Sequence, residues 1–240
     1  MDITKVTRPV RKLLKLKYCG AVIVAAGTAS RMGGIDKVMA PLGGEPVIVR
    51  TVRQFQQCDA IREIVVVTRP ELIVPIMDLC HHFDKLKAVV VGGDSREDSV
   101  NMGLNTLSEK CTLVAVQDGA RPLVTWQLID RVVRAANTYG AAAPAVPVKD
   151  TVKVVQGGVV SHTPDRSTLR AVQTPQVFDY DLLRGALGQA KANKAKITDD
   201  CSAVELMGMK VRIVEGDERN IKITTPMDLK IAELLLEETL

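Results

Sequence analysis

Four short segments of small or polar residues carry charged side chains whose types and spacing suit chemistry, and three of the four contain glycine and alanine or serine. Arg31 and Lys37 stand in the first segment, Asp118 and Arg121 in the third, and Lys222 in the fourth. The segments read AAGTASRMGGIDK (25–37), GGDSREDSV (92–100), QDGARP (117–122) and NIKITTP (220–226). Backbone N–H groups in small-residue turns, together with cations, are typical of sites that bind phosphate oxygens. The sequence therefore indicates phosphate chemistry.

The first of these turns fits neither of two standard phosphate-binding loops. Residues 25–27, Ala-Ala-Gly, project nothing bulky, so a ligand can approach the backbone closely. A P-loop requires adjacent Gly-Lys-Ser/Thr, which Lys37 does not provide, and the dinucleotide fingerprint GxGxxG fails at Ala29 and Met32. The turn favours phosphate binding, but a tight strand-to-helix connection with solvated surface cations remains the alternative from this segment alone.

Histidine and cysteine do not occur in these four segments. His81 and His82 are adjacent, and adjacent side chains on a regular element point in different directions, so we do not expect them to share a metal ion. The five cysteines are widely spaced and form no CxxC pair, which favours a reducing, cytoplasmic compartment.

Apolar strand-like runs alternate with helix-like segments, and this order predicts how the four segments are brought together. Expected strands span 20–26, 63–68, 87–91, 112–116 and 141–148, and expected helices span 46–57, 99–107 and 127–139. A βαβα order predicts a parallel sheet with helices on both faces. Because ligands bind at the carboxyl ends of the strands in such sheets, the four polar segments should converge at one edge.

The pattern changes over residues 150–172, where no helix is expected. Two short strands, 150–155 and 159–163, flank a glycine pair, and a third strand is expected at 169–172. This block is either an edge hairpin or an arm that packs on another subunit. The α/β pattern then resumes, with expected helices at 180–193, 201–207 and 227–238 and an expected strand at 211–214.

Composition supports an α/β protein and argues against several functional classes. Of the 240 residues, 46% are hydrophobic but only 3% are aromatic, so Val, Ile, Leu and Ala must fill the core, as in sheets of buried parallel strands. The net charge is +4, of which residues 1–17 supply +5, leaving about −1 (4 − 5) for the body, which is therefore not a basic nucleic-acid binder. No run of 18 apolar residues occurs, so no membrane span is expected.

The basic N-terminal extension, residues 1–17, is interpreted as a solvated segment. Weak contacts with anions or a remnant of a targeting peptide are the alternatives. No apolar stretch separates its cations from the first expected strand, which argues against a secretory signal.

Taken together, the motifs resemble those of the 2-C-methyl-D-erythritol 4-phosphate cytidylyltransferase family of isoprenoid-precursor synthesis. Besides the four segments, the likeness rests on PVKDTVK, AVQTPQVF, ITDDCSAVE and VEGDERNIKITTPMDL, and it covers about residues 18–238. The resemblance implies an α/β fold with a doubly wound, mostly parallel, Rossmann-like nucleotidyltransferase sheet. It also implies a single domain over 18–240, with a protruding β-arm at about 150–172 that supports a homodimer.

For the nucleotide, the resemblance implies roles at the carboxyl ends of the strands. Arg31 and Lys37 would stabilise charge on the phosphates of CTP. Asp118 and Arg121 would lie beneath the ribose and phosphate region. The cytidine pocket would be lined by Ala25, Ala26, Gly27, Gly93, Asp94 and Ser99.

For the acceptor, a sugar-alcohol phosphate, the resemblance implies residues from two subunits. Thr151 and Arg166, on the arm, would reach the methylerythritol phosphate in the neighbouring subunit's site. Lys222 would orient that phosphate, and Thr198 would contact the sugar alcohol. Arg31, Lys37, Arg166 and Lys222 would then be the catalytic cations.

The implied reaction transfers CMP from CTP to the acceptor phosphate and releases pyrophosphate. A phosphate monoester is already an anionic nucleophile near pH 7 and needs no general base, which fits the lack of His and Cys in the four segments. We expect Mg²⁺ as the cofactor, held mainly by the triphosphate because magnesium takes few protein ligands, with Asp118 as a possible ligand.

The chain departs from the family's usual residues at Ala29, Asp36, Val38 and Gln117. A carboxylate at position 36, beside Lys37, could weaken the positive field on a phosphate group. Two alternatives stay open: a sister cytidylyltransferase that acts on ribitol 5-phosphate or a similar polyol phosphate, and a non-catalytic nucleotide-binding protein. Residues 150–172 and 197–202 would distinguish the two acceptors.

Overall fold

A mixed β-sheet forms the centre of the computed structural model, which describes residues 16–27 and 36–238. One half of the sheet is parallel and consists of β1 (Cys19–Val24), β4 (Ile61–Thr68), β5 (Leu86–Val91) and β6 (Leu113–Asp118). β1 pairs with β4 on one side and with β6 on the other, and β5 pairs with β4. The carboxyl ends of these four strands therefore meet at one edge of the sheet.

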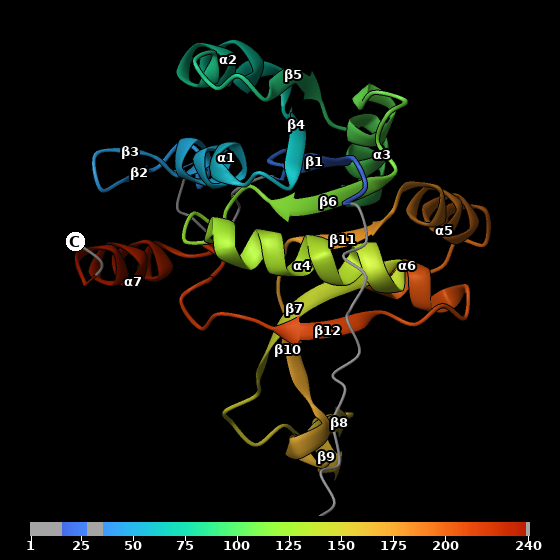
Figure 1. The fold of residues 1–240 in the computed structure, drawn as a ribbon. Helices are drawn as coiled ribbons and strands as arrows, with labels where there is room; N and C mark the ends of the chain where they lie inside the picture. The colour runs from blue at the N-terminus through green and yellow to red at the C-terminus, as the bar shows by residue number, and fades with distance from the viewer. Residues whose placement is uncertain (1–15, 28–35, 239–240) are drawn as a thin grey trace, which may run out of the picture.

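The other half of the sheet is mixed and consists of β7 (Ala141–Pro147), β10 (Arg170–Val172), β11 (Gln176–Asp179) and β12 (Arg212–Glu215). β11 lies between β6 and β7 and runs antiparallel to both, so β6 and β7 share one direction. β12 runs parallel to β7, and β10 runs antiparallel to it. In the described part of the chain the order is β10-β7-β11-β6-β1-β4-β5, with β12 also on β7 (Figure 1). The prediction of an α/β fold with a mostly parallel sheet is confirmed.

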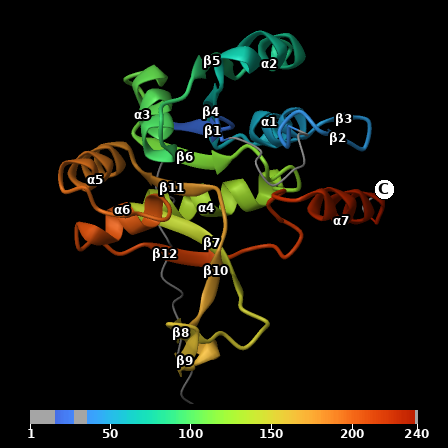
Figure 2. The ribbon, with the colours of Figure 1, turned by 180° about the vertical axis from the view of Figure 1, so that it is seen from behind.

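Helices cover both faces of the sheet and bury its central strands, such as β1, β4 and β6, on both sides. One face packs against α1 (Val47–Gln57), α2 (Ile73–Cys80), α4 (Trp126–Tyr139) and, at its margin, α7 (Pro226–Glu237). The opposite face, turned toward the viewer in Figure 2, packs against α3 (Arg96–Thr106), α5 (Tyr180–Ala192) and α6 (Asp200–Leu206). Within β1, Ala21 and Ile23 belong to the first core and Val22 to the second, as the alternation of side chains along a strand requires.

Local sequence signals set where the helices around the site begin. α3 begins three residues before the expected position because the hydroxyl of Ser95 accepts a hydrogen bond from the N–H of Asp98, at 3.0 Å. In α7, Thr225 and Asp228 form a capping box, with Pro226 at the first helical position. α3 packs closely on the sheet because Gly103 has no side chain: a Cβ there would lie 2.3 Å from Cγ1 of Val22.

Some elements were not anticipated from the sequence. α2 and the small hairpin of β2 (Pro41–Leu42) and β3 (Glu45–Pro46) carry no strong periodic pattern. β11 has only four residues, and its place between β6 and β7 depends on contacts with distant strands. Short strands of this kind are defined by their neighbours and not by their own sequence.

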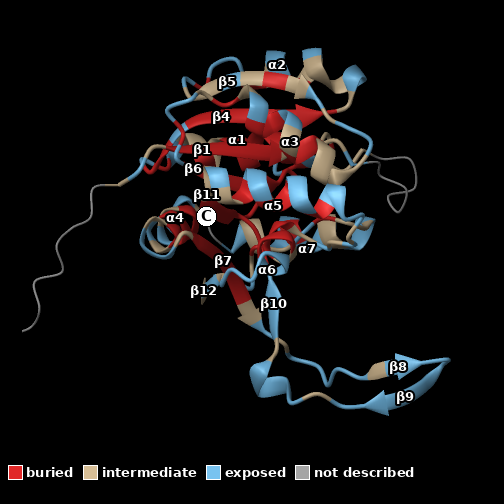
Figure 3. Cartoon of the chain, turned by 90° about the vertical axis from the view of Figure 1, so that its right-hand side faces the viewer, coloured by how far each residue is buried: buried red, intermediate tan, exposed pale blue. Residues whose placement is uncertain are grey.

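Within the block over residues 150–172, a hairpin projects from the body of the protein, whereas β10 at its end pairs with β7 in the central sheet. β8 (Val154–Gln156) and β9 (Val159–His162) pair only with each other in the described structure, as a two-stranded sheet. Gly157 and Gly158 join them with φ angles of 56° and 81°, conformations that suit glycine in a tight hairpin turn. Figure 3 shows this hairpin as an exposed projection. The first expected strand, 150–155, is wrong in its first four residues, because 150–153 have no strand partner.

Further expectations concern the N-terminal extension, the extent of the domain and the presence of membrane-spanning helices. Of the basic extension at 1–17, only Leu16 and Lys17 are within the described residues, and the single domain over 18–240 stays a prediction. Lys17 lies against the body, with its Nζ 2.9 Å from Oδ2 of Asp179. Within residues 16–27 and 36–238, none of the helices has the length and apolar character needed to span a bilayer.

Candidate functional site

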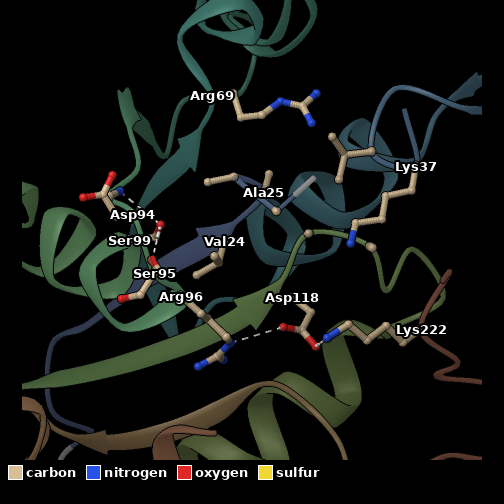
Figure 4. Close-up of a pocket in the computed structure, with 16 residues that line it drawn as sticks. Val24, Ala25, Lys37, Arg69, Asp94, Ser95, Arg96, Ser99, Asp118 and Lys222 are labelled. Carbon is tan, nitrogen blue, oxygen red and sulfur yellow. Dashed lines mark hydrogen bonds and ion pairs between the residues drawn. The ribbon is translucent and has the colours of Figure 1, made fainter. Parts of the chain in front are cut away.

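A cavity of about 440 Å³ lies at the carboxyl ends of β1, β4, β5 and β6. Nine of the residues predicted from the sequence line it: Ala25, Ala26, Gly27, Lys37, Gly93, Asp94, Ser99, Asp118 and Lys222. Figure 4 shows Lys37 and Lys222 on one side of this cavity and Asp94, Ser95 and Ser99 on the other. Four segments that are far apart in sequence thus contribute to one site, as their positions after the strands predicted.

Backbone hydrogen bonds hold the strand exits together at the floor of the cavity. The N–H of Ala25 donates to the carbonyl of Val67 at 2.7 Å, and the N–H of Gly119 donates to the carbonyl of Val24 at 2.8 Å. The N–H of Gly92 donates to the carbonyl of Thr68 at 2.8 Å. These bonds continue the sheet beyond the last residues of β1, β5 and β6. The turns that face the cavity are therefore fixed to the rigid part of the fold.

Glycine is required where the β5–α3 turn closes over the start of the helix. The N–H of Gly93 donates to Oγ of Ser99 at 3.2 Å. A Cβ on Gly93 would lie 2.3 Å from Cβ of Asp98 and 3.2 Å from its carbonyl carbon, so a larger residue would displace the helix. The absence of a side chain lets this turn lie directly on the first turn of α3 and leaves its backbone open toward the cavity.

Asp118 is the centre of a cluster of cations at the end of β6. Its Oδ2 lies 2.8 Å from Nζ of Lys222 and 3.5 Å from Nε of Arg121, and its Oδ1 lies 3.9 Å from Nε of Arg96. Burial by itself raises the pKa of this carboxyl group, but the charges of Lys222 and Arg96 more than offset it, so the pKa lies below its ordinary value. Asp118 is therefore ionised at neutral pH and orients the three cations around it.

Arg121 supports this cluster from just outside the cavity. Its Nη1 donates to the carbonyl of Asn220 at 2.6 Å, which ties the turn after β6 to the segment that carries Lys222. Asn220 is fully buried, and its amide donates to the carbonyl of Thr174 at 2.9 Å. Arg121 thus holds Asp118 and the Lys222 segment together, although the residue does not line the cavity itself.

Arg96 and Asp200 form a pair that sequence reasoning did not assign. Arg96 Nη1 and Nη2 donate to the two carboxylate oxygens of Asp200 at 3.0 and 2.8 Å, and the carboxylate is completely buried. Burial by itself lowers the pKa of the Arg96 guanidinium, but the charge of Asp200 and these hydrogen bonds more than offset it, so the pKa is raised. Each residue stood inside a quoted motif, GGDSREDSV or ITDDCSAVE, but nothing in the sequence indicated that they pair.

Lys37 is carried by a short helical turn next to the cavity. The turn begins at Asp36, whose carbonyl accepts hydrogen bonds from the N–H groups of Met39 and Ala40 at 3.2 and 2.8 Å. A Cβ on Gly27 would lie 3.7 Å from Nζ of Lys37, so the ammonium group lies beside the turn that follows β1. Arg31, the other predicted cation of this segment, lies outside the described residues.

The carboxylate of Asp36 is neutralised by a partner that the sequence did not reveal. Arg69 Nη2 donates to Asp36 Oδ2, and both side chains are partly buried at the rim of the cavity. The expectation that Asp36 could weaken the field of Lys37 treated this carboxylate as unpaired. Because Arg69 cancels the charge of Asp36, the net charge of Asp36, Lys37 and Arg69 together is positive.

Gln117, another departure from the family's usual residues, lies beneath the cavity. Its side chain is completely buried, and neither its amide nitrogen nor its amide oxygen has a hydrogen-bond partner among the described residues. Adjacent residues of a strand point to opposite faces, so Gln117 is directed away from the face that carries Asp118. It is not among the residues that line the cavity.

Three predicted acceptor residues lie away from this cavity. Arg166 and Thr151 are exposed on the arm, where Arg166 Nη1 donates to the carbonyl of Lys149 at 2.6 Å. Thr198 is exposed in the loop before α6, and its N–H donates to Oγ of Ser202 at 3.0 Å. The chain therefore brings the predicted nucleotide residues together but leaves the predicted arm residues outside its own cavity.

The donor set at the cavity does not form a protein cage for a metal ion. Within the described residues, no group of three or more His, Cys, Asp or Glu side chains could hold one. Two carboxylates, Asp94 and Asp118, line the cavity, and Oδ2 of Asp118 is already bonded to Lys222. This arrangement fits a Mg²⁺ ion held mainly by ligand phosphates, with Asp94 or Oδ1 of Asp118 as a single protein ligand.

Comparison with known sequences assigns the chain to a family. The sequence profile described as "IspD: 2-C-methyl-D-erythritol 4-phosphate cytidylyltransferase" matches residues 19–238. The chain belongs to the IspD family. The match contains the turn after β1, the Asp118 cluster, the arm and Lys222. It includes every helix and strand of the described residues, from β1 to α7.

Individual IspD proteins are similar to the chain over nearly their whole lengths. A 2-C-methyl-D-erythritol 4-phosphate cytidylyltransferase of Caldanaerobacter subterraneus subsp. tengcongensis is 44% identical over 227 residues, which span 91% of this chain and 98% of that protein. A protein of the same name from Symbiobacterium thermophilum is 47% identical over 219 residues, which span 90% of this chain and 92% of that protein.

Solved IspD structures have the same fold. A 4-diphosphocytidyl-2C-methyl-D-erythritol synthase from Anaerococcus prevotii superposes with a TM-score of 0.84 at 33% identity, covering 92% of this chain and 96% of its own. The 2-C-methyl-D-erythritol 4-phosphate cytidylyltransferase of Thermus thermophilus superposes with a TM-score of 0.72 at 33% identity, covering 90% and 98%. The chain therefore has the length and fold of an IspD cytidylyltransferase.

Proposed function

We propose that this protein transfers CMP from CTP to 2-C-methyl-D-erythritol 4-phosphate and thereby forms 4-diphosphocytidyl-2-C-methyl-D-erythritol and pyrophosphate. The observation that carries the proposal is that Lys37 and Lys222, from opposite ends of an IspD-family chain, line one cavity at the carboxyl edge of the sheet. Relatives that carry this name are 44% and 47% identical to the chain.

The reaction requires relief of negative charge and alignment of two phosphate groups. An oxygen of the acceptor phosphate attacks the α-phosphorus of CTP, a new P–O bond forms, and the bond to the β-phosphate oxygen breaks with its electron pair leaving on pyrophosphate. Positioned cations lower the energy of the crowded transition state, and cavities of low polarity strengthen their effect. Lys37, together with Arg31, serves the triphosphate, and Lys222 serves the acceptor phosphate.

The cavity walls supply the nucleotide site. The backbone of Ala25, Ala26 and Gly27 admits the nucleotide closely because no long side chain projects from it. Gly93, Asp94 and Ser99 form the opposite wall and bind the cytidine. Asp118 acts mainly through its partners, since its carboxylate holds Lys222 in place at 2.8 Å and is buried against Arg121 and Arg96.

A divalent cation, Mg²⁺, completes the proposed site. When bound, it neutralises phosphate oxygens and favours departure of pyrophosphate. Most of its ligands are oxygens of the triphosphate, and the protein offers one carboxylate, from Asp94 or Asp118. Lys222 competes for one Asp118 oxygen, which favours a single contact at most between that residue and the metal.

The acceptor half of the site comes from a second copy of the chain in this proposal. Arg166 and Thr151 are exposed on the arm and lie outside the chain's own cavity. The hairpin of the arm also exposes Val155, Val159 and Val160 by 53%, 71% and 53%, and a lone two-stranded hairpin is marginally stable in water. A homodimer would cover these valines and deliver Arg166 to the neighbouring cavity.

A reducing cytoplasmic environment suits the proposed enzyme. All five cysteines are buried and unpaired, so no disulfide contributes to the fold. Expression of a tagged full-length chain, followed by fractionation of the cells, tests this assignment. Recovery of the enzyme from the membrane fraction would contradict it.

The decisive experiment is pyrophosphate release from CTP in the presence of 2-C-methyl-D-erythritol 4-phosphate and Mg²⁺. Matched reactions replace CTP by ATP or UTP and replace the acceptor by ribitol 5-phosphate. Rapid release only with CTP and methylerythritol phosphate supports the proposal. Faster release with ribitol 5-phosphate would reassign the acceptor, and CTP binding without pyrophosphate release would indicate a non-catalytic nucleotide-binding protein.

A further inference from the structure

The pair of Asp36 and Arg69 joins two separate parts of the cavity rim. Arg69 follows directly after β4, where Thr68 accepts the N–H of Gly92 and where the carbonyl of Arg69 itself accepts the N–H of Leu72 at 3.0 Å. The backbone of Arg69 is therefore fixed at a strand end. Asp36 lies on the other side, at the first residue of the turn that carries Lys37. Their side chains meet and form an ion pair in which each is only 22–23% exposed.

The two carboxylate oxygens of Asp36 have different partners. Oδ1 accepts the N–H of Val38 at 3.0 Å and so caps the turn locally, whereas Oδ2 accepts Nη2 of Arg69. The far side of the turn is anchored in the core, because Val38 is 2% exposed and its carbonyl accepts the N–H of Ile48 at 2.9 Å. Lys37 lies between the cap at Asp36 and the core contact of Val38, so the direction of its side chain depends on both.

We infer that Arg69 supports Lys37 through Asp36, because its guanidinium group cancels the carboxylate charge beside the Lys37 ammonium group, while Oδ1 of Asp36 caps the turn at Val38 independently of Arg69. The inference rests on the proposed function, since it assigns to Lys37 a role on the triphosphate of CTP. Arg69 itself also lines the cavity, and we assign its effect to the charge that it cancels on Asp36 rather than to direct contact with the substrate. Arg69 is needed because Asp36 is present: an uncompensated carboxylate at position 36 would repel the triphosphate and attract the Lys37 ammonium group.

The side chain of Arg69 has a second carboxylate within reach. Nε of Arg69 lies 2.8 Å from Oε1 of Glu71, whose side chain is 63% exposed, whereas Asp36 is mostly buried. Exposed ion pairs contribute little, so the Glu71 contact should be dispensable. The Asp36 contact differs because it links two elements of the site.

The test uses four variants of the full chain: Arg69→Gln, Asp36→Asn, the double variant, and Arg62→Gln. Asp36→Asn removes the charge but keeps an oxygen that can cap the turn at Val38. Arg62→Gln is the matched control, because Arg62 is exposed at the opposite end of the same strand. Steady-state pyrophosphate release and calorimetric binding of CTP are measured for each variant, and thermal unfolding verifies that each is folded.

We expect Arg69→Gln to lower kcat/KM for CTP and to weaken CTP binding by about tenfold, because the charge of Asp36 is then uncompensated. Asp36→Asn and Arg62→Gln should remain within about twofold of the unmodified protein. The double variant should recover most of the activity that Arg69→Gln loses, because the carboxylate beside Lys37 is gone and the remaining partner of Arg69, Glu71, is largely exposed to solvent. A role confined to general folding would not produce this recovery.

Two outcomes would overturn the inference. An Arg69→Gln variant with unchanged kcat/KM and CTP affinity would show that the ion pair has no role at the site. A double variant as impaired as Arg69→Gln would show that Arg69 acts on the nucleotide directly. Failure of the proposed function gives a different result, in which the unmodified protein releases no pyrophosphate, and the CTP-binding measurements then still decide the role of Arg69.

Discussion

The cavity at the strand ends and the protruding arm both carry residues that the proposed reaction needs, but they differ in how completely one chain builds them. In the cavity, Asp118 is nearly buried and bonded to Lys222, and backbone bonds fix the turns around it. On the arm, Arg166 is exposed, and its Nη1 donates to the backbone carbonyl of Lys149. The difference teaches that one chain preorganises the cavity proposed for the nucleotide, and it supports the proposal that a second chain completes the acceptor half.

Lys37→Ala should produce the largest effect, because it removes a cation from the preorganised cavity. Turnover should fall about 100-fold or more, in line with the loss of a positioned group that stabilises a transition state. Steady-state pyrophosphate release measures the change, and Lys110→Ala, an exposed lysine before β6 at the opposite end of the sheet, is the control. Equal turnover in both variants would show that the cavity is not the catalytic centre.

Arg166→Ala should have the next largest effect, about a 30-fold loss of turnover, if the arm supplies a charged contact to the acceptor. The comparison is sharpened by mixing equal amounts of Arg166→Ala and Lys37→Ala subunits and allowing them to exchange. Half of the dimers are then mixed, and each contains one site with both residues intact, so about a quarter of the original activity should return. Verified exchange without any recovery would place Arg166 outside a shared site.

Asp118→Asn should have a smaller effect, which is measured as a loss of stability. A substitution on the exposed arm should not produce this loss, so the comparison separates the buried cavity from the arm. The variant should lose about 1.5 kcal/mol of unfolding free energy at pH 7, because Lys222 and its neighbours lose a charged partner. The pKa of Asp118 is lowered in the folded state, so its contribution is present above the ordinary value of about 3.9 and disappears as the pH falls through the lower folded value.

Urea unfolding at pH 7 and at a series of values below pH 4 measures this difference. The control is Val159→Thr on the arm, where the side chain is 71% exposed, and its unfolding free energy should change by at most about 0.5 kcal/mol at any pH. A stability difference for Asp118→Asn that stays constant into the acid range would contradict the ion-pair account of Asp118.

Local sequence was sufficient for much of the fold and for the cavity wall. Apolar runs predicted β1, β4, β5 and β6, and the small polar segments after them predicted where Asp118 and Lys37 would converge, because parallel strands end at the same edge. The glycine pair at 157–158 and the lack of a covering helix predicted a hairpin, at a sheet edge or on an arm, and the family resemblance favoured the arm. The resemblance of the motifs supplied the family, which the comparisons confirm over residues 19–238.

Long-range pairing was beyond sequence reasoning. Arg96 and Asp200 are separated by 104 residues and Asp36 and Arg69 by 33, and neither pair has a local spacing that marks it. β11 was also missed, because four residues between two distant strands have no periodic pattern of their own. Each of these features depends on which elements become neighbours in space.

The sequence by itself determined the alternation of buried strands and helices, the small-residue turns that leave backbone open to a ligand, and the set of cations near them. These properties are local, since they depend on periodicity, side-chain volume and charge within a few residues. The tertiary structure alone decided which charges are neutralised and which face the cavity, because ion pairing depends on distances between segments that only packing brings together. Arg69 beside Asp36, and Lys222 on Asp118, are the two contacts in which that decision is visible.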